Sequence, residues 1–126
     1  MHNEPRKQKP LVSLKKQSEF KHVFGRGKSA AMPLFVLYAA SNDLGYSRLG
    51  VSISKKVGNA VVRNRVKRWV REYCRLMLGG TKPGQAFDLI VIARTPAGEL
   101  PREGAFVKVS DTLSRLFLRL GVLEKK

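Results

Sequence analysis

The sequence predicts an α+β fold in which three helices pack on a small mixed sheet of about four strands. The expected order along the chain is α-β-β(-β)-α-β-α. Segments with the apolar spacing of helices alternate with shorter strand-like segments, and one of the latter is apolar throughout. The chain has 126 residues, of which 43% are hydrophobic. This length and composition suit one domain with a small core.

The first predicted helix runs from Ser18 to Phe24. Ser18 is a suitable N-cap, and Gly25 is expected to end the helix. Phe20, Val23 and Phe24 lie at positions i, i+3 and i+4, so they form one apolar face.

Two strands are expected next. Residues 32–40 are apolar and rich in strand-forming types, with Pro33 at the start of the strand or at a break. Residues 42–45 read Asn-Asp-Leu-Gly, which predicts a turn. Residues 48–54 alternate between large apolar and small residues, which predicts a strand with one buried face.

A long second helix follows. Asn59 is a suitable N-cap for a helix from Ala60 to about Leu78, and the glycines at 79 and 80 are expected to end it. Residues 87–93 form an unbroken apolar run, which is typical of a central strand. Pro101 is expected in the first turn of a last helix. The apolar stripe of that helix comprises Phe106, Val109, Leu113, Leu116, Phe117 and Leu120.

We expect one folded domain at residues 14–122, a basic disordered tail at 1–13 and a short tail at 123–126. No run of 18 apolar residues occurs, and the basic N-terminus lacks the apolar segment of a secretory signal. The single cysteine, Cys74, excludes an internal disulfide and a multi-cysteine zinc site. These features fit the reducing cytoplasm.

The charge distribution predicts a polyanionic partner. The chain has 25 Lys and Arg against 9 Asp and Glu, a net charge of +16. Residues 1–28 have a net charge of +6 and residues 48–75 one of +8. Nucleic acid is the commonest partner of such a surface, and a membrane surface is the second possibility.

The second helix combines an apolar face with a basic face. At 100° per residue, the apolar face comprises Val62, Val66, Trp69, Val70, Tyr73 and Met77. The opposite face comprises Asn64, Lys67, Arg68, Arg71 and Arg75, with Arg63 and Arg65 at the two borders. An ordinary solvated helix face mixes charges of both signs, whereas only Glu72 opposes this run. The pattern therefore favours phosphate binding along about three helical turns.

The segment 52–68, Ser-Ile-Ser-Lys-Lys-Val-Gly-Asn-Ala-Val-Val-Arg-Asn-Arg-Val-Lys-Arg, resembles the signature of the bacterial ribonuclease P protein family. Residues 14–24, 35–38 and 88–94 resemble further parts of that family, so the resemblance covers roughly residues 12–120. It implies an accessory subunit of a ribozyme, an endoribonuclease whose catalytic site and Mg²⁺ ions belong to the RNA. It also implies binding to the catalytic RNA and to the single-stranded 5′ leader of precursor tRNA. A left-handed βαβ crossover is expected from the resemblance alone.

Two RNA-binding surfaces are predicted. The catalytic RNA is expected to contact Arg63, Asn64, Arg65, Lys67, Arg68 and Arg71 of the second helix, with Lys55 and Lys56 near its start. The resemblance implies that the leader binds between the first helix and the sheet, at Phe20, Phe24, Phe35, Tyr38 and Ser52. Aromatic rings suit unpaired bases. The competing interpretation is that these aromatic residues belong to the core, as we expect for Trp69.

No catalytic constellation is visible in the sequence. His2 lies in the predicted tail, and His22 is expected on a helix surface. No His/Asp or Cys/His pair is apparent, and Asp43, Asp88 and Asp111 are scattered. Cys74 is expected at the edge of the core. We therefore expect no catalytic residue, firmly bound cofactor or metal site in the protein.

Three other classes of protein remain as alternatives. A ribosomal protein would share the size, charge and fold class. A protein-only nuclease would need clustered acids or a histidine pair, and a membrane-surface module would need an apolar helix face without a core to join. We expect no membrane partner and no obligatory protein partner.

Overall fold

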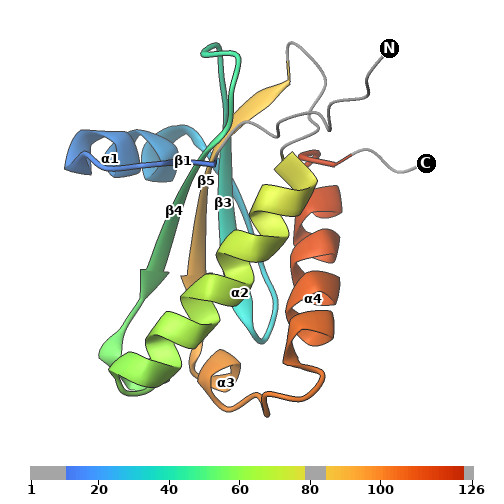
Figure 1. The fold of residues 1–126 in the computed structure, drawn as a ribbon. Helices are drawn as coiled ribbons and strands as arrows, with labels where there is room; N and C mark the ends of the chain where they lie inside the picture. The colour runs from blue at the N-terminus through green and yellow to red at the C-terminus, as the bar shows by residue number, and fades with distance from the viewer. Residues whose placement is uncertain (1–10, 79–84, 124–126) are drawn as a thin grey trace, which may run out of the picture.

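A computed structural model describes residues 11–78 and 85–123, and residues 1–10, 79–84 and 124–126 lie outside its description. The described strands form one mixed sheet with the order β1-β4-β5-β3-β2 (Figure 1). The strands are β1 (Val12–Ser13), β2 (Lys28–Ala31), β3 (Phe35–Asn42), β4 (Arg48–Ile53) and β5 (Ala86–Ala93). The helices are α1 (Gln17–Arg26), α2 (Ala60–Leu78), α3 (Thr95–Gly98) and α4 (Ala105–Arg119), with a 3-10 turn at Lys55–Val57. The predicted α+β class is confirmed.

The connection from β4 through α2 to β5 is a left-handed crossover. β4 and β5 are parallel neighbours. In Figure 1 both strands point downward, β5 lies to the right of β4, and α2 crosses in front of the sheet. About 98% of such connections in proteins are right-handed, so this handedness is exceptional.

The sheet separates two layers of helices. Along β5, Leu89 and Val91 face the main core with α2, α3 and α4, whereas Ile90 and Ile92 face a smaller cluster with α1. Because successive side chains of a strand point to opposite faces, a strand buried on both faces is apolar throughout. This explains the continuous apolar run of residues 87–93.

The observed helix ends agree with the prediction only in part. α2 has the predicted bounds, and the Asn59 side chain accepts a hydrogen bond from the Val62 amide at 3.0 Å, as expected of an N-cap. The glycines predicted to end α2 lie outside the described residues. The predictions for the other two helices were wrong at their starts. α1 begins at Gln17 and contains Gly25, and α4 begins at Ala105 rather than near Pro101.

Two short edge strands add to the predicted sheet. The predicted tail at 1–13 was wrong at its end, because Val12 and Ser13 pair with β4 in parallel. β2 pairs with β3 and was not predicted, and the following strand begins at Phe35 rather than at residue 32. No helix among the described residues is both long and apolar enough to cross a lipid bilayer.

Candidate nucleic-acid interfaces

The basic face of α2 presents cations that form no ion pair among the described residues. Lys67, Arg68 and Arg71 are exposed, and Arg65 is half-buried. None of these four side chains forms an ion pair with another residue in the described part of the chain. We call these four residues and the exposed Asn64 the cationic face. Unpaired cations on one side of a helix favour a ligand with regularly spaced negative charges.

The start of α2 is held by a compact loop. The half-buried Arg63 donates from Nε to the carbonyl oxygen of Gly58 at 3.1 Å. A Cβ atom at Gly58 would lie 2.7 Å from Cγ1 of Val62, so the loop needs glycine there. Lys55 and Lys56 are exposed in the 3-10 turn that precedes this loop. The loop therefore adds two cations near the N-terminus of α2, as predicted, while Arg63 also has a structural role.

An open groove of about 590 Å³ runs between α2 and the β1 edge of the sheet. Leu11, Ser13 and Leu49 line one side. The α2 side is lined by Asn64, Lys67, Arg68, Arg71, Glu72 and Arg75. Glu72, the one acidic residue that the sequence places among these basic residues, forms an ion pair with Arg75. Leu11 and Ser13 were not predicted to border this surface, because no sequence signal pairs β1 with β4.

The aromatic surface lies on the opposite layer, where α1 covers the sheet. The ring of Phe20 packs over Gly50, where a Cβ atom would lie 2.5 Å from Cε2 of that ring. Phe24 is 44% exposed and contacts Tyr38 edge to face, with ring centroids 4.8 Å apart. Ser52 is exposed two residues beyond Gly50, on the same face of β4. Four of the five predicted leader residues therefore share one surface.

The prediction for Phe35 was wrong. Phe35 is completely buried in the main core, on the sheet face that α2 and α4 cover. Tyr38 belongs to the α1 layer instead. Positions three apart on a strand point to opposite faces, so the sequence spacing already separated Phe35 from Tyr38.

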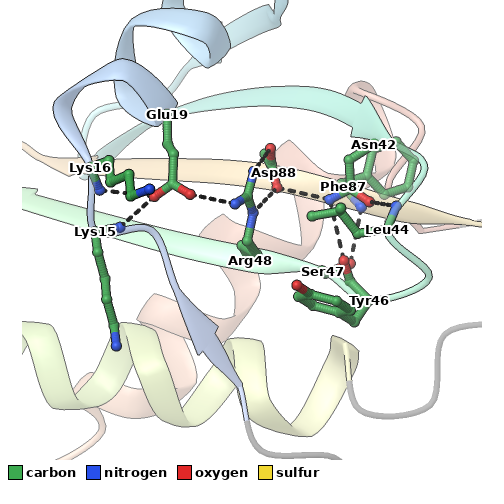
Figure 2. A network of polar contacts seen from close by, with 10 residues as sticks. All are labelled: Lys15, Lys16, Glu19, Asn42, Leu44, Tyr46, Ser47, Arg48, Phe87 and Asp88. Atoms are coloured by element: carbon green, nitrogen blue, oxygen red, sulfur yellow. Dashed lines mark hydrogen bonds and ion pairs between the residues drawn. The ribbon is translucent and has the colours of Figure 1, made fainter.

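A network of hydrogen bonds and ion pairs connects α1 to strands β4 and β5 (Figure 2). Arg48 donates to Asp88 through Nε at 2.8 Å and through Nη2 at 2.7 Å. Its Nη1 atom pairs with Glu19 of α1. Asp88 is 2% exposed and also accepts from the side-chain amide of Asn42 at 2.8 Å. These hydrogen bonds from Arg48 and Asn42 offset the cost of burying the Asp88 side chain.

The pKa shifts follow the network geometry. The hydrogen bonds to Asp88 raise the pKa of Arg48 above its ordinary value. Glu19 accepts hydrogen bonds from the backbone amides of Lys16 and Lys15, each at 2.8 Å. These bonds, and secondarily the charge of Arg48, lower the pKa of Glu19. The sequence analysis missed this network, although a charged residue near the start of each of the two neighbouring strands, Arg48 and Asp88, was a usable signal.

The other predicted core and surface assignments have mixed outcomes. His22 is exposed, as expected, and Cys74 is completely buried rather than at the core edge. Burial raises the pKa of the Cys74 thiol to about 12, so it is protonated at neutral pH and unsuited to nucleophilic attack. Met77 was wrongly placed on the buried face, since it is 38% exposed. Trp69 is only half-buried, so the prediction of a core residue was wrong in part.

Among residues 11–78 and 85–123, no three His, Cys, Asp or Glu side chains cluster as metal ligands would.

Comparisons with known proteins agree over most of the chain. The family model described as Ribonuclease P matches residues 9–119. The ribonuclease P protein component of Exiguobacterium sibiricum is 43% identical over 114 residues, which cover 90% of this chain and 93% of that protein. The corresponding component of Thermoanaerobacter pseudethanolicus is 46% identical over 109 residues, or 86% of this chain and 89% of that protein.

Solved structures with the same fold include proteins from two bacteria. The RNase P protein of Staphylococcus aureus superposes with a TM-score of 0.78 at 33% identity, covering 90% of this chain and 98% of that one. The RNase P protein of Thermotoga maritima gives a TM-score of 0.69 at 33% identity, covering 90% of this chain and 98% of that one.

Proposed function

The chain belongs to the ribonuclease P protein family, and we propose on that premise that it binds two RNAs at once. One is the catalytic RNA of the holoenzyme, and the other is the single-stranded 5′ leader of precursor tRNA. In this proposal the holoenzyme cuts the leader from the precursor and so produces the mature 5′ end.

The cationic face of α2 is the surface we assign to the catalytic RNA. Folded RNA presents mainly phosphate and ribose to a protein, so it needs cations more than aromatic rings. Lys67, Arg68 and Arg71 are exposed and unpaired within the described residues, which supports this assignment. Arginine adds a planar group that binds two phosphate oxygens together.

The aromatic surface on the α1 layer is the one we assign to the leader. An unpaired strand exposes the faces of its bases, and aromatic side chains bind those faces with little dependence on sequence. The exposed ring of Phe24 beside Tyr38 is the single observation that carries this assignment.

We further propose that the protein has no catalytic residue and that the catalytic Mg²⁺ ions are held by the RNA. The protein then contributes affinity for the substrate and for the catalytic RNA. The buried, protonated Cys74 and the exposed, isolated His22 support this division, because neither is arranged for acid–base or nucleophilic chemistry.

The test removes the exposed ring without opening the core. Phe24→Ala is expected to weaken holoenzyme binding to precursor tRNA by about 5-fold or more, as for the loss of one stacked base. Binding to mature tRNA, which has no leader, should not change. Affinities for precursors with long and trimmed leaders measure the difference.

Leu118→Ala is the matched control, because Leu118 is 43% exposed against 44% for Phe24 but lies on α4. It should affect neither substrate. An equal loss for Phe24→Ala with and without the leader would contradict the assignment.

A further inference from the structure

A small cavity lies on the side of the cationic face that is turned away from β1. It has a volume of about 270 Å³ and is lined by Val61, Arg65, Arg68, Trp69 and Arg102. We call it the Trp69 cavity. Arg68 lines both this cavity and the groove beside β1, so it stands between the two. Arg102 belongs to the segment between α3 and α4, far from α2 in the sequence.

The apolar part of the Trp69 cavity is not explained by phosphate binding. Trp69 packs against the main core with part of its surface and remains half-exposed at the cavity. Val61 is 64% exposed beside it. A surface that bound only phosphates would gain nothing from the exposed part of this indole, whereas a base gains stacking and apolar contact.

The charged part of the cavity lacks a counter-ion. Arg65, Arg68 and Arg102 line it together, and no acidic side chain is among the lining residues. None of the three forms an ion pair or side-chain hydrogen bond with another described residue. Three neighbouring guanidinium groups repel one another, and an anionic ligand would relieve that repulsion.

We propose that the Trp69 cavity binds one unpaired nucleotide of the catalytic RNA. The base contacts Trp69 and Val61, and its phosphate is held by the three arginines. The volume is slightly below that of pockets for drug-sized ligands, which suits a single base. This inference rests on the proposed binding of the catalytic RNA by α2, but it adds a specific subsite that includes a residue outside that helix.

Trp69 is the only tryptophan of the chain, so it reports directly on its own cavity. Acrylamide quenching of its fluorescence would be measured while the full-length protein is titrated with transcribed catalytic RNA. We expect quenching to fall in a saturable way, at the same RNA concentration at which labelled RNA is half-bound. Inorganic polyphosphate, an anion without bases, is the comparison ligand and should protect Trp69 much less.

Variants test the contacts separately. Arg102→Ala should weaken binding of the catalytic RNA about tenfold, as for one lost hydrogen bond to a charged group. Arg119→Ala removes the same charge from the C-terminal end of α4 and should have a much smaller effect. Trp69→Leu should cost about 5-fold or more, and Trp69→Phe, which keeps a ring, clearly less. If Trp69→Leu does not fold, the comparison of Arg102→Ala with Arg119→Ala still tests the cavity. Both arginine side chains are exposed, so neither substitution disturbs the core.

The two proposals fail in different ways. Tight RNA binding with unchanged quenching of Trp69 would overturn the cavity while leaving the binding by α2 intact. Equal protection by polyphosphate, or equal effects of Arg102→Ala and Arg119→Ala, would also overturn it. Absence of any RNA binding would overturn both proposals.

Discussion

At the residue scale, Arg48 connects the layer of α1 with the centre of the sheet. It binds the buried Asp88 with two hydrogen bonds and Glu19 with a third. Glu19 precedes Phe20 directly, so the ion pair ties to β4 the same turn of α1 whose Phe20 ring packs over Gly50. The aromatic surface thus depends on a charged group that is itself covered by protein.

Because the pKa of Glu19 is lowered in the folded protein, the ion pair between Glu19 and Arg48 is sensitive to acid. A carboxylate whose pKa is lower in the folded state stabilises the fold fully above its unfolded pKa of about 4.5, and this contribution is lost as pH falls through the folded pKa. We therefore expect Glu19→Gln to lower the free energy of unfolding at pH 7 by more than it does at pH 3. Urea denaturation of both proteins at the two pH values measures this.

Glu72→Gln is the control for that experiment. Glu72 pairs with Arg75 at the surface, where both side chains are 45% exposed, and such exposed pairs contribute little. Glu72→Gln should change the free energy of unfolding only slightly at both pH values. A Glu19→Gln effect of the same size at pH 3 and pH 7 would show that the carboxylate charge is not responsible.

At the element scale, α2 contributes one face to the core and exposes its basic face, to which we assign the catalytic RNA. Val66, Val70, Tyr73 and Cys74 are buried against the sheet and α4. Lys67 and Arg71 lie one turn apart on the exposed side. Since neither side chain contributes to the core, the helix can lose its charges without losing its packing.

We expect the double variant Lys67→Ala/Arg71→Ala to weaken binding of the catalytic RNA by tenfold or more while the thermal transition is retained. Each lost cation removes about one phosphate contact and its released counter-ion. Both residues lie outside the Trp69 cavity, so this test is independent of it. Filter binding and thermal unfolding measure the two properties.

The matched control is Lys108→Ala/Arg119→Ala, which removes the same two charges from exposed positions of α4. An equal loss of affinity in both double variants would mean that net charge, and not the cationic face, determines binding.

At the scale of the whole molecule, the sheet keeps the two proposed RNA surfaces apart. α2 and α4 lie together on one side in Figure 1, and the α1 layer packs on the other face of β5. A sheet that is buried on both faces is a rigid separator. The proposed function therefore does not require the catalytic RNA and the leader to compete for the same side chains.

The net charge of +16 should make assembly strongly dependent on salt. If about six to eight phosphates are contacted, log affinity falls with log salt concentration at a slope of about −5 to −7. Titrations of the protein with catalytic RNA at several KCl concentrations measure the slope. A slope near −1 would rule out an interface made mainly of phosphate contacts.

The sequence by itself determined the features that depend on local spacing. The Asn59 cap and the helical period of the following residues predicted α2 and its basic face. The continuous apolar run predicted the central strand β5, and the motif at residues 52–68 led to the family. Each of the three signals lies within one element or one short segment. Within such a segment, the backbone geometry determines from the sequence position which way each side chain points.

Only the tertiary structure decided which segments meet. β1 and β2 have two and four residues, too few for a periodic signal, and their pairing partners make them strands. Trp69 and Arg102 are separated by a strand and a short helix, yet line one cavity. Arg48, Glu19 and Asp88 likewise come from three elements. Such contacts arise from the packing of whole faces, and in the left-handed crossover they override the usual local preference of the chain.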